Sequence, residues 1–144
     1  MEKQLPLVTM ITPTYNHEKY LRTAIDSVLD QDYPYIEYIV IDDGSTDGTK
    51  EILESYGNRF YWETQKNMGE IPTLNRAMAL AKGKLVGKLS SDDYLYPTCV
   101  SEVVQQFARD PDLLVVYTDY DIVDENGSLV QTLIKPNPNS SSRI

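Results

Sequence analysis

The stretch LVGKLSSDDYLYP, residues 85–97, decides the fold expected of this chain. Its first half, Leu85 to Leu89, has the composition of a buried strand, and two serines and the acidic pair Asp92 and Asp93 follow. The pair would therefore lie at the carboxyl end of a strand, where open α/β sheets bind their ligands. Adjacent carboxylates repel each other unless a cation shares them, so the pair suits a divalent metal ion. Alternatively, Asp92 caps a turn and Asp93 is solvated.

Composition narrows the class of protein. The 144 residues fit one domain with its own core. No apolar run approaches the roughly 18 residues of a membrane span, and the amino terminus lacks the pattern of a secretory signal. A single cysteine, Cys99, cannot form an internal disulfide, which indicates a reducing compartment, with the cytoplasm as the default. The net charge of −9 disfavours a nucleic-acid partner, because such binding needs clustered Lys and Arg.

Strands and helices are predicted to alternate. Short apolar or β-branched runs indicate strands over residues 7–12, 36–41, 59–64, 85–89 and 113–118, and runs at helical spacing indicate helices between them. A hairpin over 120–134 follows, with Asn126-Gly127 in its turn. The order predicts an α/β fold, a mostly parallel open sheet with helices on both faces and a hairpin near the C-terminus. Residues 1–135 are expected to form one domain, and the polar residues 136–144 a tail or linker.

Polar residues at the helix starts are predicted to act as caps. Asn16 would cap the first helix, and Thr46 or Asp47 the second. His17, the single histidine, would fall in the first turn of the first helix and is expected to have a surface role rather than a chemical one, because no partner is near it in sequence.

Three of the predicted strands end in polar residues on the same edge of the sheet. The groups are Thr14-Tyr15, Asp42-Asp43 and Asp92-Asp93, and they should converge on one crevice. Neither a GxxxxGK[ST] motif nor a GxGxxG motif after the first strand is present.

A nucleoside diphosphate fits these groups. Tyr15 can stack on a base, Asp43 can accept a hydrogen bond from a base N–H, and Asp92 can accept from ribose hydroxyls. Asp93 can hold a divalent metal ion against the diphosphate. Tyr15 can also pack on the helix below it, with or without a stacking role.

Several motifs occur in a characteristic order. They are TPTYN at 12–16, VIDDGSTDGT at 40–49, NMG at 67–69 with LNRA at 74–77 and AKG at 81–83, SDD at 91–93, and VYTDY at 116–120 with DENG at 124–127. Together, over about residues 7–135, they closely resemble the family 2 glycosyltransferases, whose GT-A fold is Rossmann-like.

The resemblance implies an enzyme domain that binds a nucleotide sugar, commonly a UDP-sugar, with Mn²⁺ or Mg²⁺. It implies inverting transfer of the sugar to an acceptor hydroxyl, in polysaccharide or glycolipid synthesis. By position, Pro13 and Tyr15 would line the base pocket, Asp43 would contact the base, Asp92 the ribose, and Asp93 the metal. A serine, Ser90, stands where the family often has the first aspartate of D-x-D. The resemblance therefore does not decide how Asp92 and Asp93 share the binding of the ribose and of the metal.

The resemblance assigns no catalytic residue to this chain. The family's general base is an aspartate in the acceptor-binding half, expected beyond residue 144, and Asp119 and Asp121 receive no such role from it. The acceptor would be a glycan or a lipid-linked sugar, and any peripheral contact with the inner face of a membrane would come from other parts of the protein.

Two other functions compete with this interpretation. One is a non-catalytic module that binds a nucleotide sugar and regulates or scaffolds a partner. The other is a nucleotidyltransferase, which would need a glycine-rich basic loop after the first strand, and residues 13–17 (PTYNH) are not such a loop.

Overall fold

The computed structural model describes residues 5–134, and the predicted tail, residues 136–144, lies outside them. The described chain forms two compact units, residues 5–104 and residues 105–134, and each is described by itself. Helix α4 (Cys99–Arg109) contains the boundary between the units, and Cys99 is its first residue.

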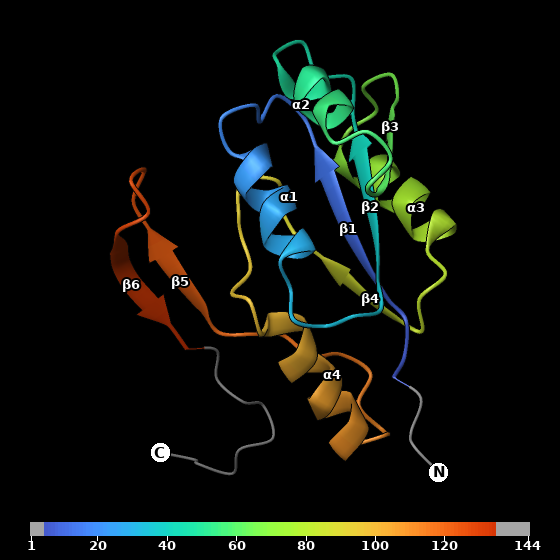
Figure 1. Cartoon of the computed structure of the whole chain (residues 1–144), viewed down its shortest axis with the longest axis vertical. Helices are drawn as coiled ribbons and strands as arrows, with labels where there is room; N and C mark the ends of the chain where they lie inside the picture. Colours follow the sequence, from blue (N-terminus) through green and yellow to red (C-terminus); the bar gives the residue numbers. More distant parts are fainter. Residues whose placement is uncertain (1–4, 135–144) are drawn as a thin grey trace. The chain divides into compact units, whose positions relative to one another are not determined.

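A four-stranded parallel sheet forms the centre of the first unit (Figure 1). Its strands are β1 (Val8–Thr14), β2 (Ile36–Asp42), β3 (Tyr61–Thr64) and β4 (Leu85–Lys88). Their order across the sheet is β3-β2-β1-β4, and Thr14 at the end of β1 pairs in register with Asp42 at the end of β2. The four predicted strands of this unit and their parallel pairing are therefore confirmed, although β3 begins at Tyr61 rather than at residue 59.

Helices cover both faces of this sheet, as predicted. Helices α1 (Leu21–Leu29) and α2 (Thr49–Ser55) lie on one face, where Ile25 and Leu53 pack in one core cluster with Val40 of β2. Helix α3 (Glu70–Leu80) lies on the other face, where Ala77 packs against Ile41 (Figure 1). Because neighbouring strand residues point to opposite faces, Val40 and Ile41 serve different clusters, and β2 needs apolar residues on both sides.

The second unit contains a two-stranded antiparallel hairpin, β5 (Tyr120–Val123) and β6 (Leu129–Leu133). Asp124 Oδ1 accepts hydrogen bonds of 2.9 Å from the backbone N–H groups of Asn126 and Ser128, and Gly127 adopts a φ of 79°. The predicted hairpin and its turn are confirmed.

The strand predicted over residues 113–118 is wrong. This segment belongs to no sheet in the described part of the chain, and Leu114 is 91% exposed. A strand is held by hydrogen bonds to a neighbour, and none of the described strands pairs with this segment. Its apolar, β-branched composition was therefore not sufficient to predict a paired strand.

Several predicted boundaries of the helices are also wrong. Asn16 does not cap α1, which begins at Leu21 after a turn, and instead takes a left-handed φ of 52°. The N-cap of α2 is Gly48, which has no side-chain cap of its own. Asp47 Oδ1 nevertheless accepts a hydrogen bond of 3.0 Å from the backbone N–H of Thr49, the first residue of α2, so the prediction that Asp47 serves this helix start is confirmed in part. Asn16 Oδ1 accepts from the backbone N–H of Thr46, and Asp47 Oδ2 accepts from that of Glu18, because hydrogen-bond acceptors next to a helix can also serve backbone N–H groups of another loop.

Candidate nucleotide-binding pocket

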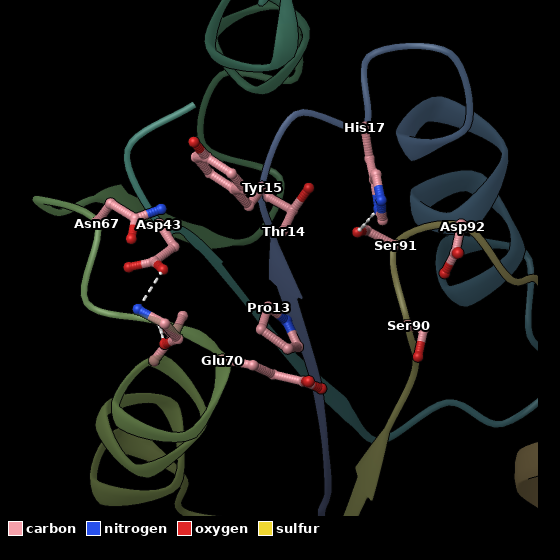
Figure 2. A pocket seen from close by; sticks show the side chains of 12 residues that line it. Pro13, Thr14, Tyr15, His17, Asp43, Asn67, Glu70, Ser90, Ser91 and Asp92 are labelled. Carbon is pink, nitrogen blue, oxygen red and sulfur yellow. Dashed lines mark hydrogen bonds between the residues drawn. The ribbon is translucent and has the colours of Figure 1, made fainter. Parts of the chain in front are cut away.

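A pocket of about 370 Å³ lies at the carboxyl ends of β1, β2 and β4 (Figure 2). Its volume is in the usual range for a small-molecule site. The residues that line it are Pro13, Thr14, Tyr15, His17, Asp43, Asn67, Gly69, Glu70, Thr73, Ser90, Ser91 and Asp92. The pocket thus brings together four of the five predicted site residues, and the fifth, Asp93, follows the lining residue Asp92.

The end of β1 forms one wall of the pocket. Pro13 and Thr14 are the last residues of the strand, and Tyr15 follows them at the rim. Tyr15 is 45% exposed, so a large part of its side chain remains accessible to a ligand. An accessible aromatic ring beside a pocket is suited to stacking on a planar ligand.

Hydrogen bonds join the loop after β1 to the loop after β2. The backbone N–H of Asn16 donates to Ser45 Oγ over 2.8 Å, and Asn16 Oδ1 accepts from the N–H of Thr46 over 2.8 Å. Close by, the N–H of Gly48 donates to Glu18 Oε2 over 2.6 Å. These contacts fix the backbone on the carboxyl side of Tyr15, so the position of that residue depends on the neighbouring loop.

Asp43 lines the pocket and is also a structural residue. Its Oδ1 accepts hydrogen bonds from Gln65 Nε2 (2.8 Å) and from the N–H of Met68 (2.9 Å), and its Oδ2 accepts from the N–H of Gly69 (2.8 Å). Burial raises the pKa of Asp43, but hydrogen bonds from Gln65, Met68 and Gly69 outweigh burial and hold the pKa below its ordinary value. The carboxylate is therefore ionised and fixed before any ligand arrives.

Asp42 does not line the pocket. It is fully buried, and its Oδ1 accepts hydrogen bonds from both the backbone N–H and the hydroxyl of Ser45. The sequence reasoning did not attribute Asp42 to the turn, yet these contacts show that it shapes the turn after β2. The two aspartates therefore have different roles: Asp42 stabilises the turn after β2, and Asp43 lines the pocket.

The loop after β4 brings Ser90, Ser91 and Asp92 to the pocket, whereas Asp93 is not among the lining residues. Burial and the neighbouring carboxylate of Asp92 raise the pKa of Asp93, and the charge of Lys88 opposes this shift. A bound cation would reduce the repulsion between the carboxylates of Asp92 and Asp93.

The donor set fits a divalent metal ion that a phosphorylated ligand helps to bind. Within residues 5–134 no group of three or more His, Cys, Asp or Glu side chains is arranged to hold a metal. A hard cation usually keeps several ligands from water and from substrate phosphates, so the carboxylates of Asp92 and Asp93 are the residues that could supply the protein's share of the ligands.

The structure corrects the prediction for His17. Its Nδ1 lies 2.6 Å from Ser91 Oγ, and its side chain lines the pocket. The residue also precedes α1 rather than standing in its first turn, and its carbonyl oxygen accepts from the N–H groups of Tyr20 and Leu21. Sequence reasoning missed this position because Ser91 is 74 residues away.

Asn67, Glu70 and Thr73 are pocket residues that sequence reasoning did not assign. The turn at residues 67–70 was the available signal, since a turn before a helix often carries ligand-binding groups. Glu70 pairs with Lys88 Nζ over 2.5 Å, and this contact holds the pKa of Glu70 below its ordinary value.

The family described as Glycosyl transferase family 2 matches residues 9–142, and the chain belongs to it. The chain is 39% identical to a chondroitin synthase of Escherichia coli over 131 residues, which are 89% of this chain but 19% of that protein. The chain therefore spans about a fifth of the length of this relative.

Solved structures agree with the expected GT-A fold. TarS 1–349 of S. aureus in complex with UDP-GlcNAc superposes with a TM-score of 0.66 at 26% identity, over 81% of this chain and 40% of that one. The mannosyltransferase PcManGT from Pyrobaculum calidifontis, in complex with GDP-Man and Mn²⁺, gives a TM-score of 0.66 at 28% identity, over 75% and 34%. No helix within residues 5–134 is long and apolar enough to cross a membrane.

Proposed function

We propose that this chain is the donor-binding part of a glycosyltransferase that binds a nucleotide-diphosphate sugar, with UDP as the nucleotide, together with Mn²⁺ or Mg²⁺. Residues 1–135 would form the donor-binding domain and residues 136–144 a linker. The main observation in support of this proposal is that Tyr15, Asp43 and Asp92 line one pocket at the carboxyl ends of parallel strands. The Mn²⁺ and nucleotide-sugar complexes of the similar structures support this assignment.

Each of the five predicted site residues has a role in this proposal. Pro13 and Tyr15 contact the base, and Asp43, whose position is fixed by three hydrogen bonds, accepts from a base N–H. Asp92 accepts from the ribose hydroxyls, and Asp93 holds the divalent ion. When bound, the ion neutralises the negative charge that develops on the departing diphosphate.

The reaction is inverting transfer to an acceptor hydroxyl in polysaccharide or glycolipid assembly. Such a step needs a base that removes the hydroxyl proton as the oxygen attacks the anomeric carbon. We assign that base to a residue beyond 144, in an acceptor-binding half. The greater length of the chondroitin synthase supports this arrangement, because this chain matches 19% of it.

A second assignment within the acidic loop also has an observation in its favour. Asp92 lines the pocket and Asp93 does not, so Asp92 is the carboxylate placed to share a metal ion with a ligand inside the pocket. In that case Asp93 would act behind it, through its charge. Separate variants of the two residues distinguish these assignments.

The test is calorimetric titration of UDP and GDP into the chain, with and without Mn²⁺. We expect UDP binding that depends on the metal. Whichever of Asp92→Ala and Asp93→Ala abolishes the dependence on Mn²⁺ identifies the main metal ligand. Asp43→Ala should weaken the preference of the site for one base, and Asp112→Ala, at an exposed residue of the second unit, is the matched control that should bind as the wild type does.

Two results would contradict the proposal in different ways. A folded wild-type chain that binds neither UDP nor GDP in the presence of Mn²⁺ would refute the donor site. Metal-dependent UDP binding by a full-length protein that never transfers sugar would instead favour the non-catalytic binding module.

A further inference from the structure

The charges of the pocket pose a problem for a diphosphate ligand. Three carboxylates line the pocket, those of Asp43, Glu70 and Asp92, and none of the twelve lining residues is a lysine or an arginine. The nearby Lys88 is already paired with Glu70. A diphosphate group carries several negative charges, so besides a metal ion it needs neutral or cationic hydrogen-bond donors from the protein.

His17 is the lining residue best suited to supply such a donor. It is the only imidazole in the sequence, and it stands on the loop after β1, opposite the loop that carries Asp92 (Figure 2). Its backbone carbonyl is held by the start of α1, and its Nδ1 is held by Ser91 Oγ at 2.6 Å. The residue is therefore held at its backbone and at one ring nitrogen before a ligand binds, which lowers the entropy lost on binding.

The Ser91 contact also decides which ring nitrogen carries the proton. Ser91 is only 2% exposed, and a buried hydroxyl needs an acceptor for its hydrogen. Nδ1 of His17 is the hydrogen-bond partner that the described residues offer to Ser91 Oγ. If the hydroxyl donates to Nδ1, the neutral imidazole carries its proton on Nε2. Within residues 5–134, Nε2 has no hydrogen-bond partner, so it is available to a ligand.

We propose that His17 is a donor-binding residue whose Nε2–H donates a hydrogen bond to an oxygen of the diphosphate of the bound nucleotide. This inference rests on the proposed function. It gives His17 two connected tasks: Ser91 orients the ring through Nδ1, and the ring recognises the diphosphate through Nε2. The base and the ribose are bound by other residues, so His17 distinguishes a nucleoside diphosphate from a nucleoside.

Two substitutions separate the tasks. His17→Ala removes both nitrogens. His17→Asn keeps an amide oxygen near the place of Nδ1, which can accept from Ser91, but offers nothing at the place of Nε2. The probes are UDP with Mn²⁺, measured by calorimetry, and uridine, measured by NMR chemical-shift changes because a nucleoside alone binds weakly.

The proposal expects both variants to lose UDP affinity by roughly tenfold or more, the effect of one hydrogen bond to a charged group, while uridine affinity stays unchanged. Three results would overturn it. UDP binding unchanged in both variants would show no diphosphate contact. Wild-type UDP binding by His17→Asn alone would limit the residue to its bond with Ser91. An equal loss of uridine and UDP affinity would mean a general effect on the pocket.

The failure of this inference differs from a failure of the proposed function. If the wild-type chain binds UDP and the His17 variants bind it with the same affinity as the wild type, only the role assigned to His17 is refuted. If the wild-type chain binds no nucleoside diphosphate with Mn²⁺, the donor site itself is refuted and the role of His17 with it.

Discussion

Asp43 Oδ2 accepts a hydrogen bond of 2.8 Å from the backbone N–H of Gly69, the N-cap residue of α3. The end of β2 and the start of α3 are thereby joined through one carboxylate at the edge of the pocket. A helix start leaves several backbone N–H groups without partners inside the helix, and an acidic group there is favourable. The same carboxylate therefore supports the fold and faces the ligand site.

Asp43→Asn should destabilise the chain by about 1–3 kcal/mol, because an amide nitrogen cannot accept a hydrogen bond from a backbone N–H. Urea unfolding at neutral pH, followed by circular dichroism, measures the loss. An unchanged midpoint would show that the loop over residues 65–69 is held by other contacts. Asp112→Asn, at an exposed position of the second unit, is the control and should have little effect.

The effect of Asp43 should also depend on pH. Its pKa in the folded chain lies below the ordinary value of 3.8, so ionised Asp43 stabilises the fold above that value. This contribution is lost as the pH falls through the lowered pKa. We therefore expect the difference in unfolding free energy between wild type and Asp43→Asn to be full near neutral pH and to shrink below about pH 4. If the difference in unfolding free energy instead grows as the pH falls, the pKa of Asp43 is raised in the folded chain and not lowered.

Gly44→Ala should be strongly destabilising for two reasons. Gly44 has a φ of 77°, and a Cβ at this residue would lie 2.9 Å from both the backbone nitrogen of Asn67 and the backbone oxygen of Gln65. Gly57→Ala is the matched control, because Gly57 has a φ of 60° but a Cβ added there would meet nothing within 4 Å. Both variants should show the backbone cost of about 1 kcal/mol, and only Gly44→Ala should add a packing cost of about 1–3 kcal/mol.

Equal losses in Gly44→Ala and Gly57→Ala would contradict the close approach between the loop after β2 and residues 65–67. Thermal unfolding of the two variants beside the wild type is sufficient, since the comparison depends on the difference between the variants.

The core position Ile25 and the exposed position Ile71 give a pair of identical substitutions. Ile25 in α1 is fully buried, whereas Ile71 in α3 is 66% exposed. Ile25→Ala should cost about 2–5 kcal/mol through lost burial and the cavity it leaves, and Ile71→Ala should change stability by about 0.5 kcal/mol or less. Urea denaturation measures both. A large effect of Ile71→Ala would mean that its side chain is covered in solution.

Asn16 tests the contact between the loops that hold Tyr15. Asn16→Gly keeps the left-handed φ of 52° accessible but removes the side chain that accepts from Thr46. Asn16→Ala removes the same contact and adds the cost of a Cβ in that conformation, about 1 kcal/mol more. We expect both variants to be less stable than the wild type, and we expect Asn16→Ala to have the lower melting temperature of the two. The reverse order would mean that residue 16 leaves the left-handed region when its amide is lost.

Local patterns were sufficient to predict most of the first unit. The apolar run at residues 36–41 gave β2, because a central parallel strand is covered on both faces and has few polar residues. The segment 113–118 has a similar composition but forms no ladder among the described residues. The difference between the two segments is a pairing partner, which local composition does not specify.

Local sequence was enough to set the alternation of strands and helices and the placement of polar residues where β1, β2 and β4 end, because both follow from periodicities and boundaries a few residues long. How those residues are used depends on the tertiary fold: Asp42 shapes a turn, Asp43 anchors α3, and His17 meets Ser91 at the pocket. These contacts join residues as far as 74 positions apart, and only the packing of the strands and loops brings such atoms within hydrogen-bond distance.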